Sequence, residues 1–315
     1  MTLQRVAAID CGTNSIRLLV ADLDPETGEL HDLDRRMTIV RLGQGVDRTG
    51  RLAPEALERT FAACREYAAV IAGHGAERLR FVATSASRDA ENREEFVSGV
   101  RAILGVEPEV ISGDEEAELS FTGATRELKQ EDGLTPPYLV FDLGGGSTEF
   151  VLGSDRVEAA RSVDIGCVRM TERHGSDTIA MRADIKTALD LAAATVPLTS
   201  AATLVGLAGT VTTVAGIALG LPAYDSTAIH HSRIPLAKVH EVTAMLLSST
   251  AEERAAIPVM HPGRVDVIAA GALVLLAVME RSGASELVVS EHDILDGIAW
   301  SAARDTAREG APETS

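Results

Sequence analysis

The stretch YLVFDLGGGSTEFVL, residues 138–152, places an apolar run on each side of three consecutive glycines. Apolar runs that flank a glycine cluster are typical of two buried strands joined by a tight turn. Glycine adopts backbone angles closed to other residues, so the N–H groups of this turn can point inward and hold phosphate oxygens. Asp142 at the end of the first run and Glu149 just past the turn could hold a divalent cation against that phosphate.

The same pattern occurs once more, near the start of the chain. IDCGTNSIRLLV, residues 9–20, aligns with FDLGGGSTEFVL, residues 141–152, and matches it at the aspartate, the first glycine and the serine. Chance similarity of two glycine-containing hairpins is the alternative. An internal duplication, however, explains both the equal spacing of the matched residues and the apolar runs that flank them. The sequence therefore predicts two related halves, each supplying one wall of a cleft.

Composition is that of a water-soluble globular protein. The chain has 315 residues, of which 45% are hydrophobic and 24% charged, so it is long enough for two domains with separate cores. The longest apolar run, residues 265–279, contains Asp266 and is short for a bilayer span. The first residues show no charged-then-apolar signal segment, so we expect a cytoplasmic protein. The three cysteines are too few and too scattered for a disulfide framework or a zinc site.

The formal net charge of −18 disfavours nucleic acid and anionic membranes as partners. It also opposes any polyanionic ligand, which would need a local cationic cleft or bound metal ions. Only 3% of the residues are aromatic, which leaves few rings to stack on a nucleotide base.

Apolar periodicity predicts an α/β chain. The expected strands are residues 3–23 (a hairpin), 30–42, 79–83, 107–111, 138–163 (a second hairpin region), 204–208 and 286–290, and the expected helices begin near residues 54, 112 and 166 and span 181–196, 262–282 and 293–308. A polar segment followed by Pro-Pro, residues 130–137, is the expected boundary. The predicted domains are residues 1–130 and 131–315, with the last helix able to pack back on the first domain.

Several polar residues follow the expected strands. Thr84 and Arg88 lie at the carboxyl end of a strand, where ligands bind in open α/β sheets, although helix capping explains them equally well. One of the acids in residues 112–118 could act as a general base, although acids in a first helical turn also stabilise the helix dipole. Residues 209–213 are expected to form a second small-residue turn that caps a helix. His230 and His231 are expected in a loop with their rings pointing apart.

The two Asp-x-Gly hairpins in tandem α/β halves resemble the actin/acetate-kinase/heat-shock ATPase superfamily, whose ribonuclease-H-like domains bind phosphates between them. Four motifs narrow the resemblance: DCGTNSIR (residues 10–17), ATSASRDAEN (83–92), ISGDEEA (111–117) and DLGGGSTE (142–149). They resemble the exopolyphosphatase / guanosine pentaphosphate phosphatase family. Residues 162–172, GTVTT (209–213) and RVDVI (264–268) also fit in order, so the resemblance covers nearly the whole chain.

The resemblance implies a metal-dependent attack of water on the terminal phosphate of polyphosphate or of pppGpp. It implies that Glu116 is the general base, and that Asp142 and Glu149 hold Mg²⁺ or another divalent cation with Asp10 nearby. The implied phosphate-binding residues are Thr13, Asn14, Ser15, Arg17, Thr84, Arg88, Gly144, Gly145, Gly146, Ser147, Thr148 and Arg264. Because Glu116 belongs to the first half, catalysis would require the two halves to close together.

The sequence departs from the family pattern at two positions. Thr13 stands where many members have serine, and Glu118 stands where arginine is common, which removes a cation near the implied base. The long form of the family adds a C-terminal helical domain of the HD-hydrolase type, for which this sequence shows no counterpart. We therefore expect a short two-domain exopolyphosphatase that favours short chains. A homodimer is left open, as are two other functions, a non-catalytic sensor of polyphosphate or an alarmone and a small-molecule kinase of the same superfamily.

Overall fold

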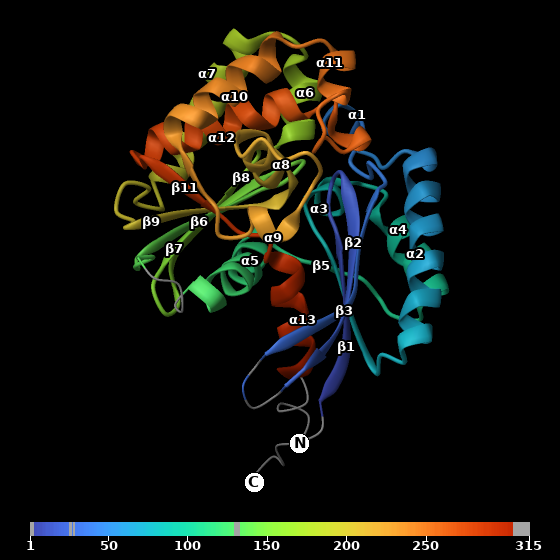
Figure 1. Cartoon of the computed structure of the whole chain (residues 1–315). Helices are drawn as coiled ribbons and strands as arrows, with labels where there is room; N and C mark the ends of the chain where they lie inside the picture. Colours follow the sequence, from blue (N-terminus) through green and yellow to red (C-terminus); the bar gives the residue numbers. More distant parts are fainter. Residues whose placement is uncertain (1–2, 25–26, 28, 129–132, 305–315) are drawn as a thin grey trace.

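The computed structural model describes residues 3–24, 27, 29–128 and 133–304, and this part of the chain forms two sheets with helices around them (Figure 1). The strand order is β3-β2-β1-β4-β5 in the first sheet and β10-β11-β9-β6-β7-β8 in the second. From its other edge the order of the second sheet is β8-β7-β6-β9-β11-β10, so its first five strands correspond in order to those of the first sheet and β10 is an addition. In both sheets the hairpin strands pair antiparallel and the next strands pair parallel. The predicted duplication is therefore confirmed in the topology.

Apart from β10, which the sequence analysis did not predict, the strands begin and end close to the predicted positions. They are β1 (Gln4–Cys11), β2 (Ser15–Leu23), β3 (Leu30–Ile39), β4 (Arg78–Ala83), β5 (Glu109–Val110), β6 (Tyr138–Leu143), β7 (Thr148–Gly153), β8 (Val157–Val163), β9 (Thr203–Leu207), β10 (Arg233–Pro235) and β11 (Glu286–Val289). The strand expected over residues 107–111 keeps only the two residues of β5.

The helices are α1 (Val46–Thr49), α2 (Pro54–His74), α3 (Ser85–Asp89), α4 (Arg93–Leu104), α5 (Gly113–Leu128), α6 (Cys167–His174), α7 (Thr178–Ala193), α8 (Ala208–Ala218), α9 (Ser226–Ile229), α10 (Leu236–Ser248), α11 (Ala251–Ala255), α12 (Ile268–Ser282) and α13 (Ile294–Arg304). The prediction of a single helix over residues 262–282 was wrong, because a separate 3₁₀ turn (Pro262–Arg264) precedes α12. Residues 209–213, predicted as a turn, belong to the start of α8. Among the described residues, no helix has the length and apolarity needed to cross a membrane.

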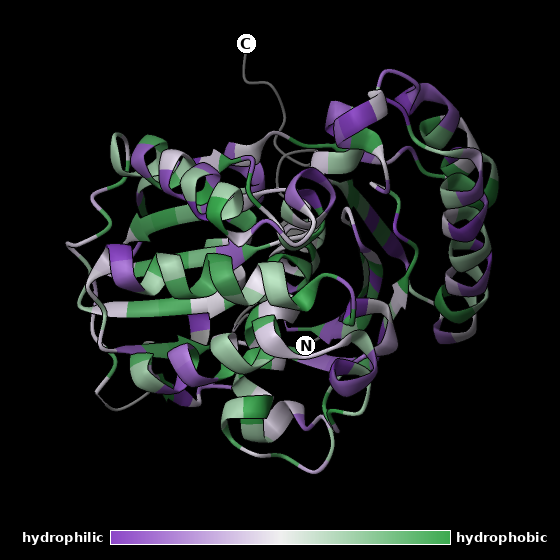
Figure 2. Cartoon of the chain, turned by 90° about the horizontal axis from the view of Figure 1, so that it is seen from above, coloured by the Kyte–Doolittle hydropathy of each residue, from purple (hydrophilic) through white to green (hydrophobic). Residues whose placement is uncertain are grey.

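Each sheet is covered on both faces. Helices α2 and α4 pack on one face of the first sheet and α13 packs on the other. The second sheet carries α6, α7, α8, α10 and α12 on one face and α5 on the other. Hydrophobic residues run through the strands and covering helices of this sheet (Figure 2). Helices α5 and α13 pack against each other between the two sheets (Figure 1). The last helix thus packs on the first sheet, while the domain limits 1–130 and 131–315 stay a prediction.

Strand alternation decides which residues face the space between the sheets. In β1, Ala7 and Ile9 face α2 and α4, so Val6, Ala8 and Asp10 face α13. The same parity in β6 turns Asp142 toward α5, together with the neighbouring Val140. The two aspartates of the duplicated motif therefore both point between the sheets.

Two glycines let α5 and α13 approach closely. A Cβ on Gly123 would lie 1.8 Å from the carbonyl oxygen of Asp293, and one on Gly297 would lie 2.2 Å from that of Leu119. Any side chain at these positions would push the helices apart. This contact sets the distance between α5 and the start of α13, from which several polar residues project.

We predict that Gly123→Ala destabilises the protein by roughly 1–3 kcal/mol, because the added methyl group meets backbone atoms that cannot move aside alone. Urea unfolding followed by circular dichroism measures the effect. The matched control is Gly73→Ala in α2, where a Cβ meets nothing within 4 Å. Alanine there should leave stability unchanged or raise it by up to about 1 kcal/mol. Equal unfolding midpoints for Gly123→Ala and the wild type would contradict the proposed close contact.

Candidate functional site

A cavity of about 90 Å³ lies where the two hairpin turns meet between the halves. Most residues proposed from the sequence line it: Asp10, Thr13, Asn14, Ser15, Arg17, Thr84, Glu116, Asp142, Gly144, Gly145, Gly146, Ser147 and Arg264. Arg88, Thr148 and Glu149 are not part of the lining. The hydroxyl of Thr148 donates to the carbonyl of Ile165 at 2.6 Å, so it stabilises the hairpin.

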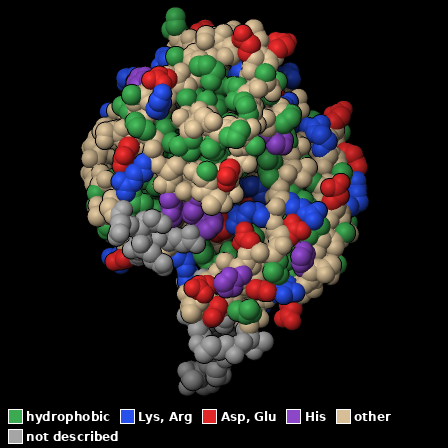
Figure 3. Space-filling model, in the orientation of Figure 1, with side chains coloured by type: hydrophobic (Ala, Val, Ile, Leu, Met, Phe, Trp, Pro, Cys, Tyr) green, Lys and Arg blue, Asp and Glu red, His purple; other side chains and the backbone are tan. Residues whose placement is uncertain are grey.

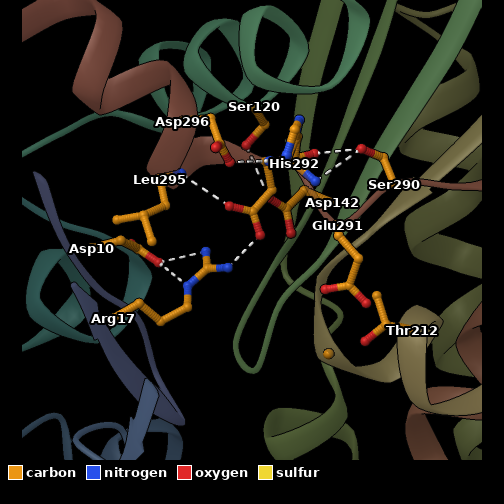
Figure 4. Close-up of polar contacts among 12 residues, drawn as sticks. Asp10, Arg17, Ser120, Asp142, Thr212, Ser290, Glu291, His292, Leu295 and Asp296 are labelled. Carbon is orange, nitrogen blue, oxygen red and sulfur yellow. Dashed lines mark hydrogen bonds and ion pairs between the residues drawn. The ribbon is translucent and has the colours of Figure 1, made fainter. Parts of the chain in front are cut away.

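In the first hairpin an aspartate lies opposite an arginine. Asp10 and Arg17 are direct partners in the β1–β2 register. Nε and Nη2 of Arg17 donate to Oδ2 of Asp10 at 3.0 and 2.7 Å, and Nη1 donates to Asp293 (Figure 4). Arg17, expected to bind phosphate, thus holds two carboxylates in this structure.

Asp293 is a site residue that the sequence analysis missed. It follows β11, just as the acids of residues 112–118 follow β5, so its place in the repeat was the available signal. Ser290, three residues before Asp293, donates its hydroxyl to the carbonyl of His292 at 2.7 Å.

In the second hairpin an acid faces another acid. Asp142 and Glu149 are partners in the β6–β7 register, at the positions equivalent to Asp10 and Arg17. The hydroxyl of Ser120 on α5 donates to Asp142 at 2.9 Å (Figure 4), and that of Ser162 donates to Glu149 at 2.7 Å. At this position of the register, the second hairpin therefore has an acid where the first hairpin has Arg17.

Electrostatics at the second hairpin oppose full ionisation. Burial, with repulsion from Asp293 and Glu149, raises the pKa of Asp142 to about 8. Burial also raises the pKa of Glu149, and burial followed by the charge of Glu149 raises that of Glu116. Like charges this close cannot all ionise at little cost, so a bound cation would relieve the repulsion.

Glu116 and Glu115, adjacent in α5, have different surroundings. The Oε2 atom of Glu116 accepts from Nη1 of Arg88 at 3.1 Å, and the same nitrogen donates to the carbonyl of Ile111 at 3.0 Å. Arg88 thus orients Glu116 and lies behind it. Glu115 pairs with Arg80 at 2.9 Å, and 46% of its side chain is exposed. Only Glu116 of these two lines the cavity.

The two glycine turns are pressed against each other. Each closes with the same backbone bond, Gly12 N–H to Ser15 at 2.9 Å and Gly144 N–H to Ser147 at 3.0 Å. A Cβ on Gly146 would lie 2.3 Å from the Ser85 hydroxyl of the first half. A side chain at position 146 would displace hydroxyl groups of the first half, so glycine lets the second turn approach that half closely.

Arg264 brings a buried positive charge to the far side of the cavity. Its Nη1 donates to the carbonyl of Gly209 at 2.9 Å and to the hydroxyl of Thr213 at 3.0 Å, both in α8. Burial lowers the pKa of this guanidinium. A buried guanidinium beside a helix N-terminus attracts anions.

A second cavity, of about 640 Å³, adjoins the first and shares Arg17, Gly209 and Arg264 with it. Met37, Val259 and Met260 give it an apolar wall. The hydroxyl of Tyr224, at its edge, donates to Glu291 at 2.6 Å and lies 2.9 Å from that of Thr212. Charged and histidine side chains gather around the hollow in this face of the molecule (Figure 3).

The histidines beside this cavity correct one expectation. The rings of His230 and His231 do not point apart but stack with centroids 3.7 Å apart, and His292 lies 4.6 Å from His230. The left-handed backbone of His231, with φ of 58°, turns its ring back over its neighbour. Within residues 3–24, 27, 29–128 and 133–304, no three His, Cys, Asp or Glu side chains converge to hold a metal ion.

Comparison with known proteins agrees with this geometry. Exopolyphosphatase 2 of Mycobacterium tuberculosis (strain H37Rv) is 53% identical, over 96% of this chain and all of its own length. The guanosine-5′-triphosphate,3′-diphosphate pyrophosphatase of Aeromonas hydrophila is 28% identical, over 93% of this chain and 58% of its own. A crystal structure of an exopolyphosphatase-like protein superposes with a TM-score of 0.92 at 45% identity, covering 98% of this chain and 100% of its own. Since residues 19–304 also match the Ppx/GppA phosphatase family, the chain belongs to that family.

Proposed function

We propose that this chain is an exopolyphosphatase, which hydrolyses the terminal phosphoanhydride bond of inorganic polyphosphate. The observation that carries the proposal is the position of Glu116, a buried acid that lines the cavity between two glycine turns. The similarity to the mycobacterial exopolyphosphatase supports the same activity. Short chains are the expected substrates.

Phosphoryl transfer depends mainly on in-line positioning and on neutralising charge. In the proposed reaction the N–H groups of the two glycine turns hold the terminal phosphate, and Arg264 with the start of α8 holds the next one. Glu116 orients a water molecule and accepts its proton as the water oxygen bonds to phosphorus. The bond to the bridging oxygen then breaks, which releases phosphate and a chain shorter by one unit.

Asp142 and Glu149 are the proposed ligands of Mg²⁺ or a similar divalent cation, and Asp10 orients Arg17 beside them. Their oxygens suit a hard cation, and Mg²⁺ commonly takes only one or two carboxylates, with waters and substrate phosphates completing its shell. An incomplete protein cage is therefore compatible with this ion. When bound, the ion would neutralise negative charge on the phosphate oxygens.

Hydrolysis of pppGpp is a second candidate activity, supported by the larger cavity. Its apolar wall and Tyr224 offer a place for a nucleoside next to the phosphate site, in spite of the low aromatic content. The similarity to the Aeromonas pyrophosphatase favours the same substrate class. The sensor hypothesis differs in one result, since it requires polyphosphate binding without phosphate release.

We predict that Glu116→Gln lowers the rate of phosphate release by about 10²–10⁴-fold and leaves polyphosphate binding largely intact, because it removes the proton acceptor. Malachite-green detection of phosphate and calorimetric titration with a short polyphosphate measure the two properties. Glu115→Gln is the matched control and should retain normal turnover, because Glu115 pairs with Arg80 outside the cavity. Turnover that survives in Glu116→Gln would remove Glu116 from the proposed role.

The contribution of Asp142 to stability without divalent cations should decrease as the pH rises. The pKa of Asp142 is about 8 in the folded protein against 3.8 for an ordinary aspartate, so the folded state binds more protons between these values. Its contribution to stability is fully present below about pH 4 and is lost as the pH rises to about 8. Thermal unfolding with a chelator tests this, and Mg²⁺ should stabilise more at pH 8 than at pH 5. An identical pH dependence of stability in the chelated wild type and in Asp142→Asn would refute the assignment.

Replacement of Tyr224 separates the two substrates. Tyr224→Ala should raise KM for pppGpp by about tenfold, the loss expected for one base–aromatic stack. Polyphosphate carries no base, so its KM should stay nearly constant. Parallel kinetics on both substrates provide the measurement, and an equal change in both would exclude a nucleoside site at Tyr224.

A further inference from the structure

Arg169, in α6, lies where three segments from both halves meet. Its Nε donates to the carbonyl of Gly146 at 2.6 Å, within the glycine turn of the second half. Its Nη1 and Nη2 donate to Asp47 in α1 and Asp89 in α3, each at 2.6 Å, and both helices belong to the first half. Only 13% of this side chain is exposed. One guanidinium therefore joins the glycine turn of the second half to two helices of the first half.

We propose that Arg169 is a positioning residue that couples closure of the two halves to the geometry of the reacting groups. For its catalytic consequence the inference rests on the proposed function. Asp89 directly follows Arg88, whose guanidinium orients Glu116. Arg169 thus connects the turn proposed to bind the terminal phosphate with the helix that orients the proposed base.

The geometry requires arginine at this position. A guanidinium presents donors in a rigid planar fork, whereas an ammonium group is a compact point charge on a flexible stem. Lysine could satisfy one or two of the acceptors on Gly146, Asp47 and Asp89, but not all of them in their present directions. Since the acceptors lie on both halves, the full set of bonds exists only when the halves are closed.

Arg173, one turn further along α6, provides an internal comparison. It bonds to Asp47 at 3.0 Å and to Asp184 at 2.8 Å, so it also joins the halves. Its contacts include neither Gly146 nor Asp89. A variant of Arg173 therefore weakens the connection between the halves without disturbing the link from the glycine turn to α3.

The test compares Arg169→Lys with the matched control Arg173→Lys in the full-length protein. For Arg169→Lys we expect kcat to fall by about 10²-fold, the cost of a small misplacement of reacting groups, while KM stays nearly constant. Amide hydrogen exchange should accelerate in residues 144–147 and 85–89. In Arg173→Lys both the kcat and the exchange of these segments should stay near wild-type values. Adding Asp89→Asn to Arg169→Lys should lower kcat by a smaller factor than Asp89→Asn does in the wild type, because the two residues act through one contact.

Three results would overturn the inference. These are unchanged kcat and exchange in Arg169→Lys, equal losses in the two lysine variants, and a lowered melting temperature with normal kcat, which would mark a purely structural role. If the wild type released no phosphate from polyphosphate, the proposed function would fail instead. Hydrogen exchange would still report whether Arg169 links the glycine turn to α3.

Discussion

Buried carboxylates between the two sheets must be balanced by positive charge, and the rest of the site is arranged around that requirement. In the first hairpin Arg17 balances Asp10 and also reaches Asp293. In the second hairpin the equivalent partners are both acids, Asp142 and Glu149, and their pKa values are raised. The duplicated motif thus differs between the hairpins, with an arginine opposite the aspartate in the first and a glutamate opposite it in the second. We propose that the second hairpin attracts a cation, which would give a protein with a net charge of −18 a way to bind a polyanion.

Closure of the halves completes the site. Glu116 comes from α5, which covers the second sheet although it follows the last strand of the first, and α13 returns from the second sheet to cover the first. Gly123 and Gly297 allow these helices to touch, which fixes Glu116, the proposed base, relative to both hairpins. Arg88 then orients Glu116 from one side and Arg264 places positive charge on the other. The site is therefore a property of the closed pair of halves.

The hairpins, their duplication and the family could be predicted from the sequence, because apolar period, glycine spacing and motif order are local features. The partners of individual side chains could not. Arg17 was expected to bind phosphate, yet the β1–β2 register places it opposite Asp10. Asp293 lies far from Arg17 in the sequence and meets it only because α13 packs on the first sheet. His231 was misjudged because a left-handed residue reverses the direction in which a side chain points.

We expect that the protein hydrolyses a phosphoanhydride bond only when the acids of the second hairpin hold a divalent cation. The most direct test is phosphate release by the wild-type protein from a short polyphosphate of defined length, measured at one pH with Mg²⁺ and with a chelator. We expect stepwise release of single phosphates with Mg²⁺ and none with the chelator. Equal release under both conditions, or tight binding with no release in either, would contradict it.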